Sequence, residues 1–281
     1  MKTAAGVLLA ACMMFCCGQD LPQVTLHYTG KTGLFFRDWP VPPGTRYSII
    51  KTAPEKLKEK LDNGEIRLAV TTEPLQKPGL KSVKYAYKAV ILAVHSANPL
   101  RNISLQQARD LLDKNQGSWR TFGGPMARLR LYIKAKPELP PPVMRHEHNH
   151  GRTRPRTILE PEELGGPPEK NVGTSAVKYS QPLKIQTEND AKSFSMLCTD
   201  PLGMACFDIT RYDEDRVHIL SVNQIPPTLE NFRYGSYPLL TVYYLTMPEK
   251  PTREEQLLID YMWNRKISAR LFKAGLLPEK R

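Results

Sequence analysis

The chain has 281 residues, of which 41% are apolar and 24% charged, and its net charge is +12. This length exceeds one ordinary core and fits two lobes, and the composition excludes an intrinsically disordered chain. The positive charge favours anionic partners such as phosphate-like solutes, nucleic acid or acidic lipid headgroups, although the same surplus also serves solubility alone.

The N-terminus predicts an export signal. Lys2 supplies a positive start, and residues 4–15 form an unbroken small or apolar run that is too short to span a bilayer. The run ends at Cys16-Cys17-Gly18, which resembles the start of a bacterial lipoprotein and makes residues 1–17 the signal and Cys17 the candidate for lipidation. Cleavage and release is the alternative, because the three residues ahead of Cys17 match the usual Leu-Ala-Gly poorly.

Export implies an oxidising compartment for the remaining cysteines, Cys198 and Cys206. A short turn containing Pro201 and Gly203 separates them. They can form a disulfide if the flanking strands bring their Cβ atoms within about 4 Å. Two buried thiols are the alternative.

The first part of the chain alternates strands with a helix. Thr52 and Glu55 form a predicted capping box, Leu57 and Leu61 share one helix face, and Gly64 follows the helix. Three strands are predicted around this helix, at Val24–Tyr28, Tyr47–Ile50 and Ile66–Thr71. This order predicts α/β layers with parallel neighbouring strands.

The middle and end of the chain continue the same alternation. Ser104 and Gln107 form a second predicted capping box, and Thr252 and Glu255 form a third, which opens a final helix that ends at Gly275. Further elements are predicted as strands at Lys88–His95, Leu129–Ile133, Met204–Asp208 and Val217–Val222, and as a helix at Thr187–Leu197.

Five segments stand in one order along the chain: AVTTEPL at 69–75, Val90–Asn98 with Asn102–Gln107 and Trp119, PLGMA at 201–205, PTLEN with GSYPL at 227–239, and the closing helix at 250–278. In this order they resemble the phosphate-binding-protein-like superfamily, the substrate-binding components of phosphate ABC transporters. The resemblance implies a type II periplasmic-binding-protein-like α/β fold. It consists of two lobes, each a mixed sheet flanked by helices, with the ligand in a cleft. One lobe would comprise residues 20–93 and 236–281, the other residues 97–233.

The resemblance also implies an oxyanion site built from three loops that carry hydroxyls, backbone N–H groups and one Arg. The first loop would supply Thr29, Gly30 and Thr32, although an ordinary turn between strands fits these residues too. The second loop would supply Thr71 and Thr72.

Thr72 stands where the family has an Asp that accepts the proton of hydrogen phosphate. Without that carboxylate, the preference for a protonated anion would be lost. Glu73 is the neighbouring substitute, but strand alternation directs it to the other side.

In the third loop, Arg145 matches the family Arg, whose guanidinium can bind two oxygens at once. Asn149 or His150 stands in the place of Ser, Gly151 matches the Gly, and Thr153 matches the Thr with a one-residue slip. A solvated basic loop is the alternative reading.

The same loop also supports a metal site. His146, His148 and His150 alternate, so they would share one side of an extended segment. Imidazole is a common ligand of Zn²⁺ and Cu²⁺.

The sequence contains no nucleophile elbow, Walker loop, paired CxxC or HExxH motif, so neither an enzyme nor a cofactor is predicted. Lys and Arg are scattered rather than arranged in a stripe with aromatic residues, so nucleic acid is not an expected partner.

Our hypothesis is an exported, lipid-anchored and monomeric solute-binding protein that captures phosphate or a related oxyanion for an ABC transporter permease. It would lie in the periplasm or on the cell surface. The alternative from another class is a module that has kept the fold, lost its ligand and serves as a surface or sensory interaction protein. Metal capture by the histidines is the third hypothesis.

Overall fold

The computed structural model describes residues 23–29, 46–134, 139–140, 181–208 and 215–280. The chain forms two compact units, one from Met1–Lys84, Tyr244–Arg270 and Lys280–Arg281, the other from Tyr85–Tyr243 and Leu271–Glu279. Two unit boundaries fall within strands β4 (Leu80–Ala89) and β12 (Leu240–Pro248), which the predicted lobes assign whole to the first lobe, and a third falls within helix α7 (Arg265–Lys273). In the described part of the chain, no helix is both long and apolar enough to cross a membrane.

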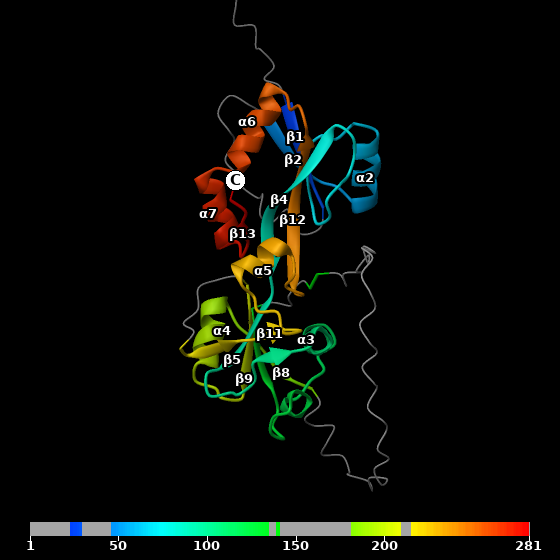
Figure 1. The fold of residues 1–281 in the computed structure, drawn as a ribbon. Coiled ribbons are helices and arrows are strands. Elements are labelled where there is room, and N and C mark those ends of the chain that lie inside the picture. Colours follow the sequence, from blue (N-terminus) through cyan, green and yellow to red (C-terminus); the bar gives the residue numbers. More distant parts are fainter. Residues whose placement is uncertain (1–22, 30–45, 135–138, 141–180, 209–214, 281) are drawn as a thin grey trace, which may run out of the picture. The chain divides into compact units, whose positions relative to one another are not determined.

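The first sheet has six strands in the order β13-β4-β12-β3-β1-β2. Strand β1 pairs in parallel with both β2 and β3, whereas β12 pairs antiparallel with β3. Its strands besides β4 and β12 are β1 (Gln23–Tyr28), β2 (Arg46–Lys51), β3 (Ala69–Thr71) and β13 (Leu277–Pro278). Helix α2 (Pro54–Asp62) and helix α6 (Arg253–Met262) lie on opposite sides of these strands (Figure 1).

Helix α2 corrects one prediction. Its N-cap is Ala53 and no side chain caps it, so the capping box of Thr52 and Glu55 is wrong. The Thr52 hydroxyl instead lies 2.9 Å from Nδ1 of His27 on β1. Proline at the first helical position favours the start of the helix, because its fixed φ suits a helix. The first N–H of a helix has no acceptor within the helix, so its absence in proline costs no hydrogen bond. The predicted Leu57 and Leu61 are buried against the sheet.

The second sheet has the order β10-β5-β9-β7-β8. Strand β7 pairs in parallel with β8 and β9, while β5 pairs antiparallel with β9 and β10. Its members are β5 (Ile91–His95), β7 (Arg130–Ile133), β8 (Leu183–Gln186), β9 (Gly203–Phe207) and β10 (Val217–Ile219).

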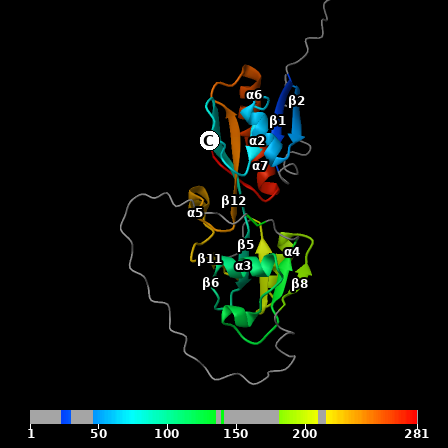
Figure 2. The same ribbon diagram turned by 90° about the vertical axis from the view of Figure 1, so that its right-hand side faces the viewer.

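Alternation along β9 assigns two helices to the two faces of this sheet. Ala205 and Phe207 belong to the cluster that contains Leu197 of α4 (Asp190–Leu197), and Met204 and Cys206 to the cluster of α3 (Leu105–Leu112). Because β9 is buried on both faces, its sequence is continuously apolar. Figure 2 shows α3 and α4 within this unit.

The two sheets repeat one topology. In each sheet the shared motif starts from a central strand with parallel neighbours, β1 or β7. The next strand, β2 or β8, pairs on one side, and a helix then leads to β3 or β9 on the other side. Each third strand also has an antiparallel neighbour, β12 or β5. This repeat is not visible in the sequence, because the equivalent strands share hydrophobicity rather than residue identity.

Three predicted elements are each divided in two. The strand at Lys88–His95 is interrupted at Val90, whose N–H donates to the Leu239 carbonyl and whose carbonyl accepts from the Tyr237 hydroxyl. The strand at Val217–Val222 becomes β10 and β11 (Ser221–Val222), and β11 pairs with β6 (Asn102–Ile103) in a separate sheet. The final helix becomes α6 and α7 (Arg265–Lys273), because Asn264 caps a new helix through its side-chain bond to the Ile267 N–H.

The remaining helices are η1 (Trp119–Phe122) and α5 (Leu229–Tyr234).

Candidate functional site

The first sheet has a topological switch point between the carboxyl ends of β1 and β3. From β1 the chain continues to β2 on one side, and from β3 it continues toward the strands on the other side. Open α/β sheets bind ligands at such points, because the two connections diverge and leave the strand ends accessible. The predicted residues Thr29 and Thr71 stand at these two strand ends, and the Thr29 N–H donates to the Val70 carbonyl at 3.3 Å.

The two threonines at this edge are buried, with 7% of Thr29 and 6% of Thr71 exposed. The Thr71 hydroxyl donates to the Glu73 carbonyl at 2.6 Å and so closes its own turn. Thr72 and Glu73 are exposed. A ligand at this edge could therefore reach the exposed Thr72 residue. To bind the Thr71 hydroxyl, it would have to compete with the Glu73 carbonyl.

His27 supports the same edge from within β1. The contact of its Nδ1 with the Thr52 hydroxyl joins β1 to the chain that leaves β2. Burial, and then the charge of Lys60, lowers the pKa of His27 below its usual 6.5. The lowered pKa favours the neutral imidazole, so His27 contributes less positive charge for an anion than an unperturbed histidine would.

The second sheet has the equivalent switch point between β7 and β9. Lys134 directly follows β7, and Asp208 directly follows β9. Asp190 opens helix α4, and its Oδ2 accepts from the Asp208 N–H at 3.3 Å. An ammonium and two carboxylates are thus associated with the carboxyl ends of these strands.

The electrostatics of this group centre on Asp190. Burial and then the charge of Asp208 raise the pKa of Asp190, while the bond from the Asp208 backbone and the charge of Lys134 lower it. The Asp208 side chain lies directly against Gly275, where an added Cβ would come within 2.8 Å of the Asp208 Oδ2. The position of Asp208 therefore depends on a glycine distant in the sequence.

Sequence reasoning missed Lys134, Asp190 and Asp208 as candidate functional residues. The available signal was position: Lys134 follows the predicted strand Leu129–Ile133, and Asp208 ends the predicted strand Met204–Asp208. Polar residues directly after buried strands lie at the carboxyl edge, but only the strand order places them at a switch point.

Most residues of the predicted oxyanion site lie outside the described residues. They are Gly30 and Thr32 of the first loop and Arg145, Asn149, His150, Gly151 and Thr153 of the third. The alternative metal ligands His146 and His148 and the lipidation candidate Cys17 also lie outside them. Their roles remain predictions.

No disulfide joins Cys198 to Cys206, and Cys206 is buried in β9. Burial raises the pKa of the Cys206 thiol. Among the residues that the structure describes, no group of three or more His, Cys, Asp or Glu side chains is placed to hold a metal ion.

Sheets with this strand order and two switch points define the class of periplasmic-binding-protein-like α/β proteins. The model of the PBP superfamily domain matches residues 42–265, and the chain therefore belongs to this superfamily. No curated protein sequence matches the chain significantly.

Solved structures agree with this assignment. PstS from Borrelia burgdorferi has a TM-score of 0.56 and 14% identity over 92% of this chain and 99% of its own. An ABC-type phosphate transport receptor from Vibrio cholerae has a TM-score of 0.55 and 12% identity over 91% of this chain and 99% of its own. The predicted type II fold and the predicted family are confirmed.

Proposed function

We propose that the protein is an exported solute-binding protein that captures phosphate or a related oxyanion and delivers it to an ABC transporter permease. The observation that carries this proposal is that Thr29 and Thr71 stand at the switch point of a fold shared with phosphate receptors. Hydroxyls and backbone N–H groups at a strand edge suit an oxyanion, because they donate hydrogen bonds without requiring a fixed counter-charge. We expect no catalytic activity.

The proposed ligand groups are those of the three predicted loops. The first loop would supply Thr29, Gly30 and Thr32, and the second would supply Thr71 and Thr72. The third would supply Arg145 with Asn149, His150, Gly151 and Thr153. We add Lys134, because it occupies in the second sheet the strand end that Thr29 occupies in the first.

Titration calorimetry with phosphate, arsenate and sulfate on metal-free protein tests this proposal. Arg145→Ala should weaken phosphate binding by about 1.5–3 kcal/mol, the loss expected for a charged hydrogen-bonding group. Arg120→Ala is the matched control, because Arg120 is an exposed arginine of η1 remote in sequence from both strand ends. Unchanged affinity in the Arg145 variant would remove this residue from the site, and absence of binding to the unaltered protein would overturn the function.

We further propose that export ends in lipid anchoring at Cys17 or in cleavage and release. Expression in a bacterium fed a labelled fatty acid separates the two outcomes. Lipidation predicts a labelled, membrane-bound protein, and Cys17→Ser should lose both the label and the membrane association. Release predicts unlabelled mature protein in the soluble exported fraction.

Two observations favour the second candidate function, a module that has lost its ligand. The Thr71 hydroxyl is engaged with the Glu73 carbonyl, and Thr72 carries no carboxylate for a protonated anion. Such a module would act as a surface or sensory interaction protein, and the calorimetric titration would then give no heat with any oxyanion.

A further inference from the structure

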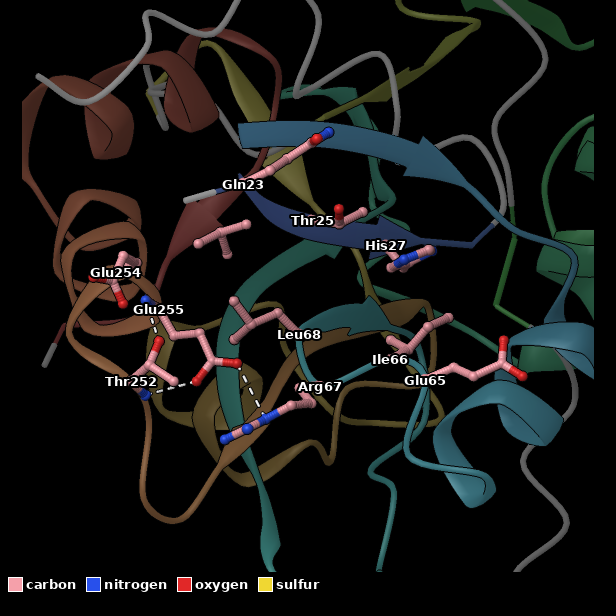
Figure 3. A pocket seen from close by; sticks show the side chains of 11 residues that line it. Gln23, Thr25, His27, Glu65, Ile66, Arg67, Leu68, Thr252, Glu254 and Glu255 are labelled. Carbon is pink, nitrogen blue, oxygen red and sulfur yellow. Dashed lines mark hydrogen bonds and ion pairs between the residues drawn. The ribbon is translucent and has the colours of Figure 1, made fainter. Parts of the chain in front are cut away.

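A pocket of about 380 Å³ lies within the first unit, away from the switch point (Figure 3). One wall is the first part of β1, another is the segment that precedes β3, and the start of α6 closes a third side. The residues that the argument uses are Thr25, Glu65, Ile66, Arg67, Glu254 and Glu255. Because these segments precede Thr29 and Thr71 in parallel strands, the pocket faces the amino ends of the strands.

The pocket coincides with an opening in the strand ladder. Strand β1 pairs with β2 along its whole length, but with β3 only at His27 and Tyr28. The His27 N–H donates to the Leu68 carbonyl at 3.0 Å, and the next bond toward the start of β1 would join Thr25 to Ile66. That bond is not formed between these two described residues. Residues two apart in a strand direct their backbone groups to the same side. Thr25 is two residues before His27, whose N–H donates to Leu68, so the N–H and C=O of Thr25 face the opening.

The charge of the lining is predominantly negative. Glu65, Glu254 and Glu255 contribute carboxylates, against the single guanidinium of Arg67. Arg67 is already bound to Glu255 at 3.1 Å, and Glu65 to Lys60 at 3.0 Å. Within the described ranges Glu254 forms no ion pair, so it is the carboxylate left to attract a cation from outside.

The lining is also held in place before any occupant arrives. The Glu255 carboxylate accepts from the Thr252 N–H at 2.7 Å, and the Thr25 hydroxyl lies 2.9 Å from that of Ser48 on β2. Glu255 and Thr25 therefore have little side-chain freedom left to lose on binding, which favours affinity.

We propose that this pocket binds a short extended peptide segment that pairs with the open edge of β1 and places a Lys or Arg side chain toward Glu254. Strand addition of this kind obtains affinity from main-chain hydrogen bonds and specificity from the flanking side chains. The buried apolar residues Val24, Ile66 and Leu68 would contact the apolar side chains of the segment.

Amide chemical-shift titration of the mature protein with acetyl-Val-Lys-Val-amide tests the proposal. Binding should shift the Thr25 and Ile66 signals. Replacing Lys by Glu should weaken affinity by about three-fold or more, as expected for loss of one exposed ion pair. Methylating a backbone nitrogen that pairs with the edge should weaken it by about ten-fold, as expected for one hydrogen bond. Equal affinity for all three peptides would overturn the proposal, as would binding of n-butylamine as tight as that of the peptide.

Variants of the protein give an independent arm. Thr25→Pro removes the N–H that faces the opening and should weaken peptide binding by about ten-fold or more, as expected for loss of one hydrogen bond. The fold should accept this change, because proline is tolerated where a strand donates no bond. Thr25→Val is the matched control, because it loses the hydroxyl but keeps the N–H. Glu254→Gln should reduce the preference for Lys over Glu. Unchanged peptide affinity in a folded Thr25→Pro protein would contradict strand addition, and if that variant does not fold, the methylated peptide decides alone.

Discussion

Asp190 is the residue whose protonation is most directly set by its neighbours at the second switch point. Its pKa is raised first by burial and then by the charge of Asp208. A raised pKa means that the folded state favours the protonated form. The resulting stabilisation is fully present below the pKa of the unfolded chain and is lost as pH rises through the folded pKa.

The Asp190→Asn variant should therefore be more stable than the parent protein at pH 7. Asn is neutral at every pH, and its side-chain oxygen can still accept from the Asp208 N–H. We expect the advantage in free energy of unfolding, measured by urea denaturation, to shrink as pH falls toward 4.

Asp110→Asn is the matched control of opposite sign. A hydrogen bond from Lys114 lowers the pKa of Asp110, so this variant should lose rather than gain stability at neutral pH. If the gain in free energy of unfolding in Asp190→Asn stayed constant between pH 4 and pH 8, the raised pKa of Asp190 would not be its cause.

At the scale of elements, capping boxes illustrate what a local pattern can predict. The box of Ser104 and Gln107 and that of Thr252 and Glu255 form both of their reciprocal bonds. The equally good pattern of Thr52 and Glu55 does not, because Thr52 still belongs to the extended chain leaving β2 and contacts His27 instead. The pattern indicates a helix nearby, and tertiary contacts decide which residue caps it.

Strand β9 depends on the absence of a side chain at its first residue. A Cβ on Gly203 would lie 2.8 Å from the Tyr132 ring and 3.0 Å from a carboxylate oxygen of Asp200. Asp200 is itself buried and accepts from the Tyr132 hydroxyl at 2.7 Å. Gly203→Ala should therefore cost about 1–3 kcal/mol of unfolding free energy, as overpacking does.

Gly64→Ala provides the comparison for this prediction. Gly64 has a φ of +78° and nothing within 4 Å of an added Cβ, so its substitution tests backbone strain alone. Denaturant midpoints measure both variants. A Gly203→Ala protein as stable as the parent would show that Tyr132 and Asp200 can move apart without loss.

At the scale of the whole molecule, both sheets contain the same order of three parallel strands, β2-β1-β3 and β8-β7-β9, which gives each sheet a switch point. Equivalent strand ends carry Thr29 in one sheet and Lys134 in the other. The sequence shows no repeat, because a strand position in a buried sheet requires an apolar residue rather than a particular one.

Ligand binding should be visible in the stability of the whole chain. If phosphate binds only the folded protein, a concentration of one hundred times Kd adds about 2.7 kcal/mol and raises Tm. Scanning calorimetry with phosphate, and with chloride at equal ionic strength, measures this effect. The rise should be largely lost in Arg145→Ala, and an equal rise with chloride would indicate a salt effect instead of a site.

The sequence by itself determined the α/β class, the superfamily and most of the buried strands and helices, since these follow from hydrophobic periodicity and from motifs in a fixed order. It also located Thr29 and Thr71 in loops that follow strands. Only the tertiary structure decided that these loops are adjacent, that Lys134, Asp190 and Asp208 are associated with an equivalent edge, and that the ladder opens beside Thr25. The physical reason is that strand order and the extent of pairing arise from contacts between residues distant in the chain, which local patterns do not specify.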